Sequence, residues 1–150
     1  MSFLKGKTAI ITGGGRPTPL EDGSAGSIGY GIAIAYAKEG ANLVITGRNM
    51  QKLEEAKEEL ERLYNIKVLA ISADISDEND NEATVKKVID QTIAEFGRID
   101  VLINNAQASA SGVSLAEHTT KQFNLAMFSG LYSAFYYMKA CYKRNKRNSY

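Results

Sequence analysis

The stretch TAIITGGGRPTPLEDGSAGSIGYGIA, residues 8–33, decides the fold of this chain. A short apolar run ends at Thr12 and is followed by glycines, a polar loop and, from Ser27, the pattern of a helix. Strand, glycine turn and helix N-terminus in this order are typical of phosphate-binding sites, because glycine backbone approaches the anion closely and the first helical amides lack acceptors. A glycine-rich turn alone also marks ordinary loops, so the rest of the chain has to decide between these interpretations.

Strand and helix patterns alternate along the whole chain. Strands are predicted at 8–12, 43–46, 67–72 and 100–104, and helices at 28–39, 51–64, 81–96 and from about 120 into the basic tail. On the first helix we expect Ile28, Ile32, Ala35 and Tyr36 to share one face, and on the second an apolar stripe made of Leu53, Ala56, Leu60 and Leu63. The order βαβαβαβα predicts an α/β fold, a Rossmann-like doubly wound parallel sheet that is incomplete, with four strands in the order 3-2-1-4. We see no linker or repeat and expect one domain, residues 1–150.

Composition excludes several classes of protein. A net charge of +1 favours neither nucleic acid nor an anionic membrane as partner. Cys141 is the single cysteine, so no disulfide forms within the chain, and a reducing, cytoplasmic compartment fits best. Residues 122–138 carry no charge, which leaves a membrane span or a buried or interface helix. The segment has only seventeen residues and includes several polar side chains, which favours a buried or interface helix over a membrane span.

Four polar or glycine-rich signals follow the four strands, where ligands bind in such sheets. They are the glycine turn, Gly47-Arg48-Asn49, Asp74-Ile75 and Asn104-Asn105-Ala106. Each alone has an ordinary interpretation as a turn or a helix cap. Their occurrence on successive strand ends indicates a shared site.

These motifs together resemble the short-chain dehydrogenase/reductase family. The resemblance rests on TG…SIGYGIA, TGRN, ADISD and NNA and spans residues 5 to about 142. It implies a nicotinamide cofactor and hydride transfer to or from a carbonyl or alcohol carbon. Carried over by position, the resemblance implies a pyrophosphate loop at Thr12, Gly13, Ile28 and Gly29. It implies an adenine contact at Asp74 and Ile75. It implies a contact with the adenosine ribose at Asn105 and Ala106.

The residues after the second strand bear on the choice of cofactor. An acidic side chain there would accept the ribose 2′-hydroxyl of NAD, but Gly47 occupies the position and Arg48 follows it. A guanidinium can pair with a 2′-phosphate in a charge-assisted fork. We therefore expect NADP(H) in preference to NAD(H), with Arg48 and the adjacent Asn49 at the cofactor.

The sequence departs from the family pattern at several points. Thirteen residues, 14–26, separate Gly13 from Ser27, and this longer loop either folds over the cofactor or bulges into solvent. Ser27 replaces the middle glycine, as in the enoyl-acyl-carrier reductase branch, and its hydroxyl can donate to phosphate. Gln107 replaces the glycine of NNAG and would narrow the nicotinamide pocket, and Gly130 stands where the last helix of the family usually carries an asparagine.

The family's catalytic serine and Tyr-x-x-x-Lys motif have no convincing counterpart. Tyr142 and Lys146 have the required spacing, with Ser129 before them, but no strand separates the serine from the tyrosine, and we interpret the match as non-catalytic. We expect the catalytic part of the domain to be lacking, as in a truncated product whose basic tail is solvated or read in a shifted frame.

Three functions remain open. The first is an NADP(H)-dependent reductase. The second is a nucleotide-binding module without turnover, which acts alone or is completed by another chain. The third is an inactive fragment. The expected partners are the dinucleotide and further copies of the chain, which would associate through the last helix and the exposed edge of the fourth strand. We expect neither nucleic acid nor a membrane as partner.

Overall fold

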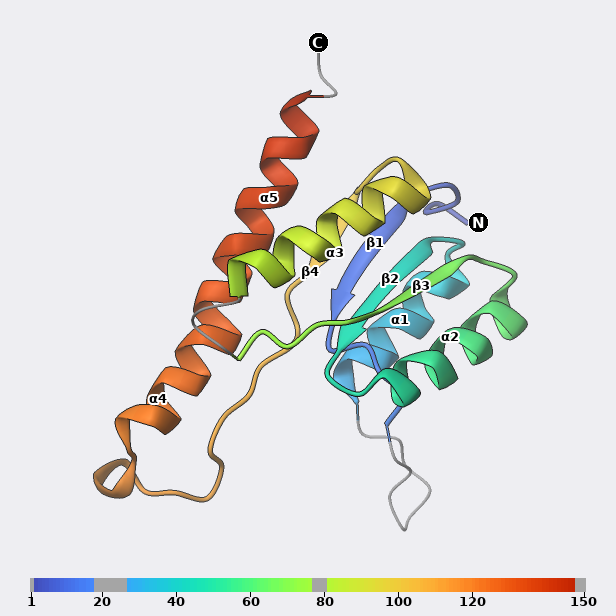
Figure 1. Ribbon diagram of the computed structural model, residues 1–150. Helices are drawn as coiled ribbons and strands as arrows, with labels where there is room; N and C mark the ends of the chain where they lie inside the picture. The colour runs from blue at the N-terminus through green and yellow to red at the C-terminus, as the bar shows by residue number, and fades with distance from the viewer. Residues whose placement is uncertain (1, 18–26, 77–80, 148–150) are drawn as a thin grey trace.

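The computed structural model describes residues 2–17, 27–76 and 81–147, and Figure 1 shows how the elements are arranged. Residues 18–26 and 77–80 lie outside the described residues. The prediction that the loop 14–26 folds over the cofactor or bulges into solvent therefore falls mostly on residues that the structure does not describe. The elements in chain order are β1 (Thr8–Thr12), α1 (Ile28–Lys38), β2 (Asn42–Gly47), α2 (Met50–Tyr64), β3 (Val68–Ser72), α3 (Asn81–Phe96), β4 (Val101–Ile103), the 3₁₀ turn η1 (Leu115–Glu117), α4 (Thr120–Ala126), the π-helical segment η2 (Met127–Tyr132) and α5 (Ser133–Arg147).

The four strands form one parallel sheet in the order β3-β2-β1-β4, as predicted. β1 pairs with β2 from Thr8 opposite Asn42 to Thr12 opposite Thr46, and with β4 from Ala9 opposite Val101. Every residue of β1 is buried, which explains its continuous apolar sequence, because both faces of the sheet are covered by helices. The carboxyl ends of all four strands therefore meet at one edge of the sheet.

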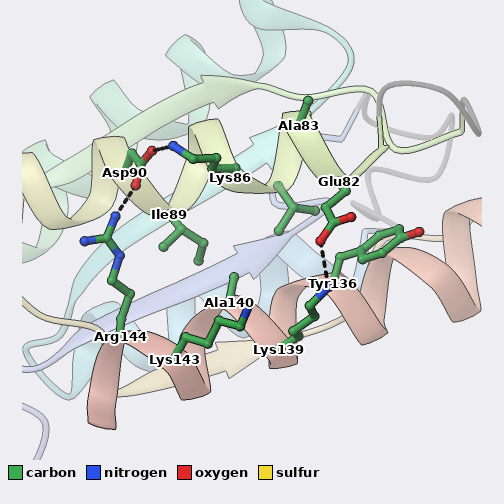
Figure 2. Close-up of a pocket in the computed structure, with 11 residues that line it drawn as sticks. Glu82, Ala83, Lys86, Ile89, Asp90, Tyr136, Lys139, Ala140, Lys143 and Arg144 are labelled. Atoms are coloured by element: carbon green, nitrogen blue, oxygen red, sulfur yellow. Dashed lines mark hydrogen bonds and ion pairs between the residues drawn. The ribbon is translucent and has the colours of Figure 1, made fainter. Parts of the chain in front are cut away.

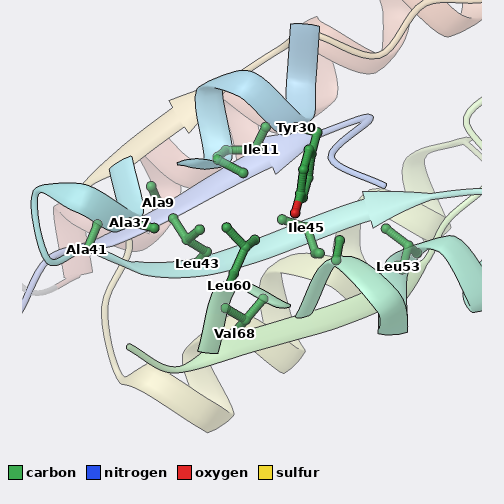
Figure 3. Close-up of a cluster of buried hydrophobic side chains, with 12 residues drawn as sticks. Ala9, Ile11, Tyr30, Ala37, Ala41, Leu43, Ile45, Leu53, Leu60 and Val68 are labelled. Carbon is green, nitrogen blue, oxygen red and sulfur yellow. The ribbon is translucent and has the colours of Figure 1, made fainter. Parts of the chain in front are cut away.

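Helices cover the two faces in pairs, α1 and α2 on one and α3 and α5 on the other (Figure 1). Figure 3 shows the core under α1 and α2, where Leu43 and Ile45 of the sheet meet Leu53 and Leu60 of α2. The second core joins Ile10 and Val44 to α3 and α5. The predicted stripe on α2 is confirmed except at its last member, because Leu63 is half exposed.

The predicted apolar face of α1 is wrong for two of its four members. Ile28 is 78% exposed and Ala35 is also exposed, whereas Ile32 and Tyr36 are partly buried against the core. The buried side chains are those of Tyr30, Ala33 and Ala37, which the prediction did not include. The residues of this helix are apolar around its whole circumference, so the periodicity of the sequence does not indicate which side faces the sheet. Two of the three buried side chains, those of Ala33 and Ala37, are small, which allows the helix to approach the sheet closely.

The last helical stretch is continuous from Thr120 to Arg147, as the sequence predicts, but it contains a π-helical segment that the sequence does not predict. α4 has no buried residue and extends away from the sheet in Figure 1, while α5 lies against α3. The π-helical segment η2 joins them. Among the described helices, none is both long enough and apolar enough to cross a bilayer.

Candidate functional site

Thr12, at the end of β1, holds the ends of two neighbouring strands together. Its hydroxyl oxygen accepts the backbone amides of Asn105 and Ala106, both at 2.9 Å, and lies 3.3 Å from the carbonyl oxygen of Ile103. The Asn105 side chain returns the contact by donating its Nδ2 to the Thr12 carbonyl oxygen at 2.9 Å. The two predicted binding motifs at Thr12 and Asn105 thus form one rigid unit.

Two glycines allow the chain to turn close to this unit. Gly13 has φ +74, a conformation that favours glycine, and its amide donates to the Thr46 carbonyl oxygen at 2.8 Å. A Cβ on Gly29 would lie 2.0 Å from the Gly13 carbonyl oxygen and 2.6 Å from Asn105 Nδ2. The start of α1 is therefore pressed against the glycine turn, as the phosphate-loop hypothesis requires.

A pocket of about 270 Å³ opens at this carboxyl edge of the sheet. Six of the predicted residues line it, one or two from each strand end: Gly13, Arg48, Asp74, Ile75, Asn105 and Ala106. The other predicted residues, Thr12, Ser27, Ile28, Gly29 and Asn49, do not belong to its lining. Four segments that are far apart in the sequence thus contribute to one concave site.

The predicted residues outside the lining support the pocket from helix N-termini or the end of β1. Ser27 caps α1, with its Oγ 3.4 Å from the amide of Tyr30, and Asn49 caps α2 by accepting the amide of Lys52 at 3.1 Å. Helix geometry leaves the amides of Ile28 and Gly29 without intrahelical acceptors. These amides, with the glycine turn beside them, fit the requirements of a phosphate group.

Charges of both signs lie at the pocket. Asp74 accepts the amide and the hydroxyl of Ser76 at 2.9 and 2.5 Å. The Ser76 hydroxyl, its amide and the Arg48 guanidinium hold the pKa of the Asp74 carboxyl below its ordinary value, against the opposing effect of partial burial. Asp74 is therefore an anionic acceptor at neutral pH, and Arg48, which lines the same pocket, is an exposed cation.

Sequence reasoning missed several lining residues. Thr46, Ser76 and Ala108 belong to the lining, and so does Ser129, which comes from the π-helical segment. Ser76 is signalled by its position two residues after Asp74, but nothing in the sequence indicates the π-helical turn that brings Ser129 to the pocket. Gln107 lines the pocket as expected, with its side chain beside Gly130.

The first part of the long loop after β1 runs toward α2 rather than across the pocket. The amide of Arg16 donates to the Lys52 carbonyl oxygen at 2.9 Å, and its guanidinium pairs with Glu59 at 2.9 Å. The remaining loop residues, 18–26, lie outside the described part of the chain.

A larger pocket of about 370 Å³ lies between α3 and α5 (Figure 2). Glu82 pairs with Lys139 at 2.8 Å, and Asp90 pairs with both Lys86 and Arg144. None of the predicted site residues lines this groove, which lies on a helical face away from the strand ends. The smaller pocket is the better candidate because ligands of such sheets bind at the carboxyl ends of the strands.

Two residues of the match to the catalytic spacing, Ser129 and Tyr142, occupy different environments. Ser129 is buried and its Oγ lies 2.7 Å from the Leu125 carbonyl oxygen, whereas Tyr142 is 63% exposed on α5. That the match is non-catalytic stays a prediction.

Comparison with known proteins gives consistent results. Residues 23–149 match a family model described as enoyl-(acyl carrier protein) reductase. The 12alpha-hydroxysteroid dehydrogenase of Clostridium sp. is 61% identical over 142 residues, which are 95% of this chain and 52% of that protein. The chain spans about half the length of the curated relatives that it matches.

Solved structures show the same fold. The L-sorbose reductase of Gluconobacter frateurii, complexed with NADPH and L-sorbose, superposes with a TM-score of 0.82 at 24% identity over 98% of this chain and 50% of that one. The NADPH-dependent 3-quinuclidinone reductase of Rhodotorula rubra superposes with a TM-score of 0.79 at 26% identity over 99% of this chain and 50% of that one.

Proposed function

Because the chain belongs to the short-chain dehydrogenase/reductase family, we propose that it forms the cofactor-binding part of an NADP(H)-dependent oxidoreductase. The observation that carries this proposal is the pocket at the strand ends, where the glycine turn and the start of α1 meet without room for a Cβ at Gly29. The bound nicotinamide would supply the hydride. The chain's own residues would bind and orient the dinucleotide.

We propose the following roles for the predicted residues. Backbone amides at Gly13, Ile28 and Gly29, with the Ser27 hydroxyl, would hold the pyrophosphate. Asp74 and Ile75 would border the adenine, and Asn105 and Ala106 the adenosine ribose. Thr12 positions the last two through its hydrogen bonds, and Asn49 holds the start of α2 beside Arg48.

Arg48 supports a preference for NADP(H) over NAD(H). It is exposed at the pocket, and Gly47 before it brings no carboxylate that would repel a 2′-phosphate. The quinuclidinone reductase that shares the fold is NADPH-dependent. Calorimetric titration of the chain with NADPH and NADH tests the proposal.

We expect NADPH to bind more tightly, and Arg48→Ala to weaken NADPH about tenfold while leaving NADH unchanged. Arg62→Ala, which removes an exposed arginine near the end of α2, is the matched control and should change neither affinity. Absence of binding by both nucleotides would refute the cofactor site. Equal losses for both nucleotides in Arg48→Ala would refute the preference alone.

The similarity to the Clostridium protein supports a substrate class. We propose that the complete enzyme interconverts a secondary alcohol and a ketone on a steroid, as the relative's name states for position 12α. A chimera that joins this chain to the remaining half of that relative should reduce NADP⁺ when a 12α-hydroxysteroid is added. A folded chimera that binds NADPH but leaves the steroid unchanged would refute the substrate class and not the cofactor site.

A second candidate function is nucleotide binding without turnover by this chain alone. Among the described residues, the pocket lining contains no tyrosine, histidine or lysine, so Asp74 is the one lining side chain of a type that commonly transfers a proton. We expect saturable NADPH binding and no NADPH oxidation with a panel of ketones. Turnover by the isolated chain would refute this interpretation.

We further propose one domain, residues 1–150, a cytoplasmic location and self-association. The support for self-association is exposed apolar surface on α4, η2 and α5, at Phe123, Leu131, Phe135 and Met138, together with the edge of β4 that β1 does not pair. Light scattering that gives a monomer at high concentration would contradict self-association.

A further inference from the structure

Asn81, the first residue of α3, lies away from the candidate site and yet contacts two elements that border it. Its side chain is fully buried, and Nδ2 donates to the carbonyl oxygens of Ile75 and Phe128, both at 2.9 Å. Ile75 lines the pocket after β3, and Phe128 belongs to η2. Figure 1 shows α3 beginning beside the junction of α4 and α5.

The chemistry at this position is specific to a neutral amide. Both acceptors are carbonyl oxygens, so only the NH₂ group of Asn81 can face them, and both of its hydrogens are used. The Oδ1 atom is buried and has no hydrogen bond with the described residues. A buried acceptor without a partner costs free energy. Because the side chain keeps this orientation despite that cost, we infer that the two hydrogen bonds donated by Nδ2 determine its orientation.

The Phe128 carbonyl depends on the π-helical turn. It accepts the amide of Ser133, five residues on, which is the hydrogen bond that defines this turn, and the Asn81 amide takes its second lone pair. Asn81 thus contacts η2 at the point where the helix departs from α-helical geometry.

Ser129, the residue after Phe128, connects η2 to the wall of the pocket that follows β4. The Ser129 hydroxyl accepts the amide of Ala108 at 2.9 Å and lies 3.1 Å from the Ala108 carbonyl oxygen. Ala108 lines the pocket after β4. A continuous path of hydrogen bonds and one peptide unit therefore runs from Ile75 through Asn81, Phe128 and Ser129 to Ala108.

We propose that Asn81 is a positioning residue that fixes the separation of the two walls of the pocket through η2. The wall after β3 and the wall after β4 belong to the outermost strands on opposite sides of the sheet, and no strand pairing joins them. Asn81 supplies the missing connection from outside the sheet. The consequence for cofactor affinity rests on the proposed function, whereas the connection itself does not.

The test compares Asn81→Leu, a variant of similar shape without donors, with Val88→Ala. Val88 is a fully buried residue of α3 that makes no contribution to the path, so its truncation destabilises the same helix by packing alone. Asn81→Ala is the second variant in case leucine prevents folding. Amide hydrogen exchange of the ligand-free chain is the first readout, and the NADPH dissociation constant is the second.

We expect the Asn81 variants to raise the exchange rate of the Ala108 amide about tenfold, although this amide contacts Ser129 and not Asn81, and to leave β1 protected. Val88→Ala should raise exchange in α3 without a selective effect at Ala108. Unchanged exchange at Ala108 in folded Asn81 variants, or the same change in Val88→Ala, would overturn the inference.

The nucleotide readout separates this inference from the proposed function. If NADPH binds the unaltered chain, its dissociation constant should rise about tenfold in the Asn81 variants and remain within twofold in Val88→Ala. If NADPH does not bind the unaltered chain, the proposed function fails, and the exchange experiment still decides whether Asn81 connects the walls. An unchanged dissociation constant in the Asn81 variants would refute the effect on the pocket.

Discussion

Adding one methyl group at Gly29 tests the close approach of α1 to the glycine turn. In Gly29→Ala the new Cβ would lie 2.0 Å from the Gly13 carbonyl oxygen and 2.8 Å from its carbonyl carbon, both backbone atoms. Gly29 has no positive φ, so the test is steric and involves no change in backbone preference. Contact distances between non-bonded heavy atoms are about 3.5 Å, so the helix start must move by more than about 1 Å.

The cost should be at the upper end of the range for overpacking. Such insertions destabilise proteins by about 1–3 kcal/mol, and here the obstacle is backbone fixed by β1 and not the end of a flexible side chain. We expect a loss of about 3 kcal/mol in the free energy of unfolding. With an m-value of about 2 kcal/mol/M, the urea midpoint should fall by about 1.5 M.

Gly31, two residues later in α1, provides a matched control. No atom lies within 4 Å of the Cβ that would be added there, and the residue is exposed. Gly31→Ala should stabilise the chain by up to about 1 kcal/mol, because alanine has the higher helix propensity. Urea unfolding followed by circular dichroism measures both variants, and equal midpoints for Gly29→Ala and Gly31→Ala would refute the proposed close approach.

Three further changes test the supports of the sheet. Thr12→Val leaves the two backbone amides that its hydroxyl accepts without a partner and should cost about 2–4 kcal/mol in urea unfolding, whereas Thr12→Ser should retain most of the stability. Burial alone would raise the pKa of Asp100, but Arg98, the Thr8 amide and Lys7 hold it below the ordinary value of 3.8, so the carboxylate stabilises the fold above that pH and the contribution is lost as pH falls through the lower folded pKa. Asp100→Asn should therefore show a smaller loss of stability between pH 5 and about pH 2 than the unaltered chain, and an equal loss would contradict this assignment. Burial raises the pKa of Tyr137 to about 12, against a smaller opposing effect of the nearby Thr46 side chain. The Tyr137 hydroxyl makes no hydrogen bond of ordinary geometry within the described part of the chain, so Tyr137→Phe should be neutral or stabilising by up to about 1 kcal/mol, and a clear loss in thermal unfolding would show that the contact with Thr46 is a stabilising hydrogen bond.

The sheet was predictable from the sequence because its strands are short apolar runs separated by amphipathic helices. β1 was predicted with its observed bounds, and the order of all four strands followed from the rules for parallel crossovers. The stripe of α2 was also readable, since Leu53, Ala56 and Leu60 stand out against charged neighbours. Such contrast between faces is what a periodicity argument requires.

Two features were not predictable for physical reasons. α1 lacks a polar face, so a pattern of hydrophobicity does not encode which side of the helix is buried, and the close contact of Gly29 with the glycine turn is a steric fit that such a pattern does not contain. The π-helical segment of the last helix contacts Asn81 and Ala108, which are 47 and 21 residues from their partners in the sequence, so no local pattern indicates these contacts. Of the candidate site, the sequence therefore indicated the residues at the strand ends and missed those that η2 adds.

The π-helical segment also determines which way α5 is turned about its own axis. Each residue of an α-helix advances the chain by about 100°, so one residue more or fewer between α4 and α5 rotates the whole of α5 by that angle. As the chain stands, Tyr137 and Cys141 point into the core, while Met138 and Tyr142 point outward. Loss of a single residue from η2 would bring Met138 and Tyr142 to the places against the sheet that Tyr137 and Cys141 now occupy. Tyr137 and Cys141 would turn to the partly buried places of Tyr136 and Ala140. The identity of the molecule's outer surface along α5 is thus fixed by the length of a six-residue segment that precedes it.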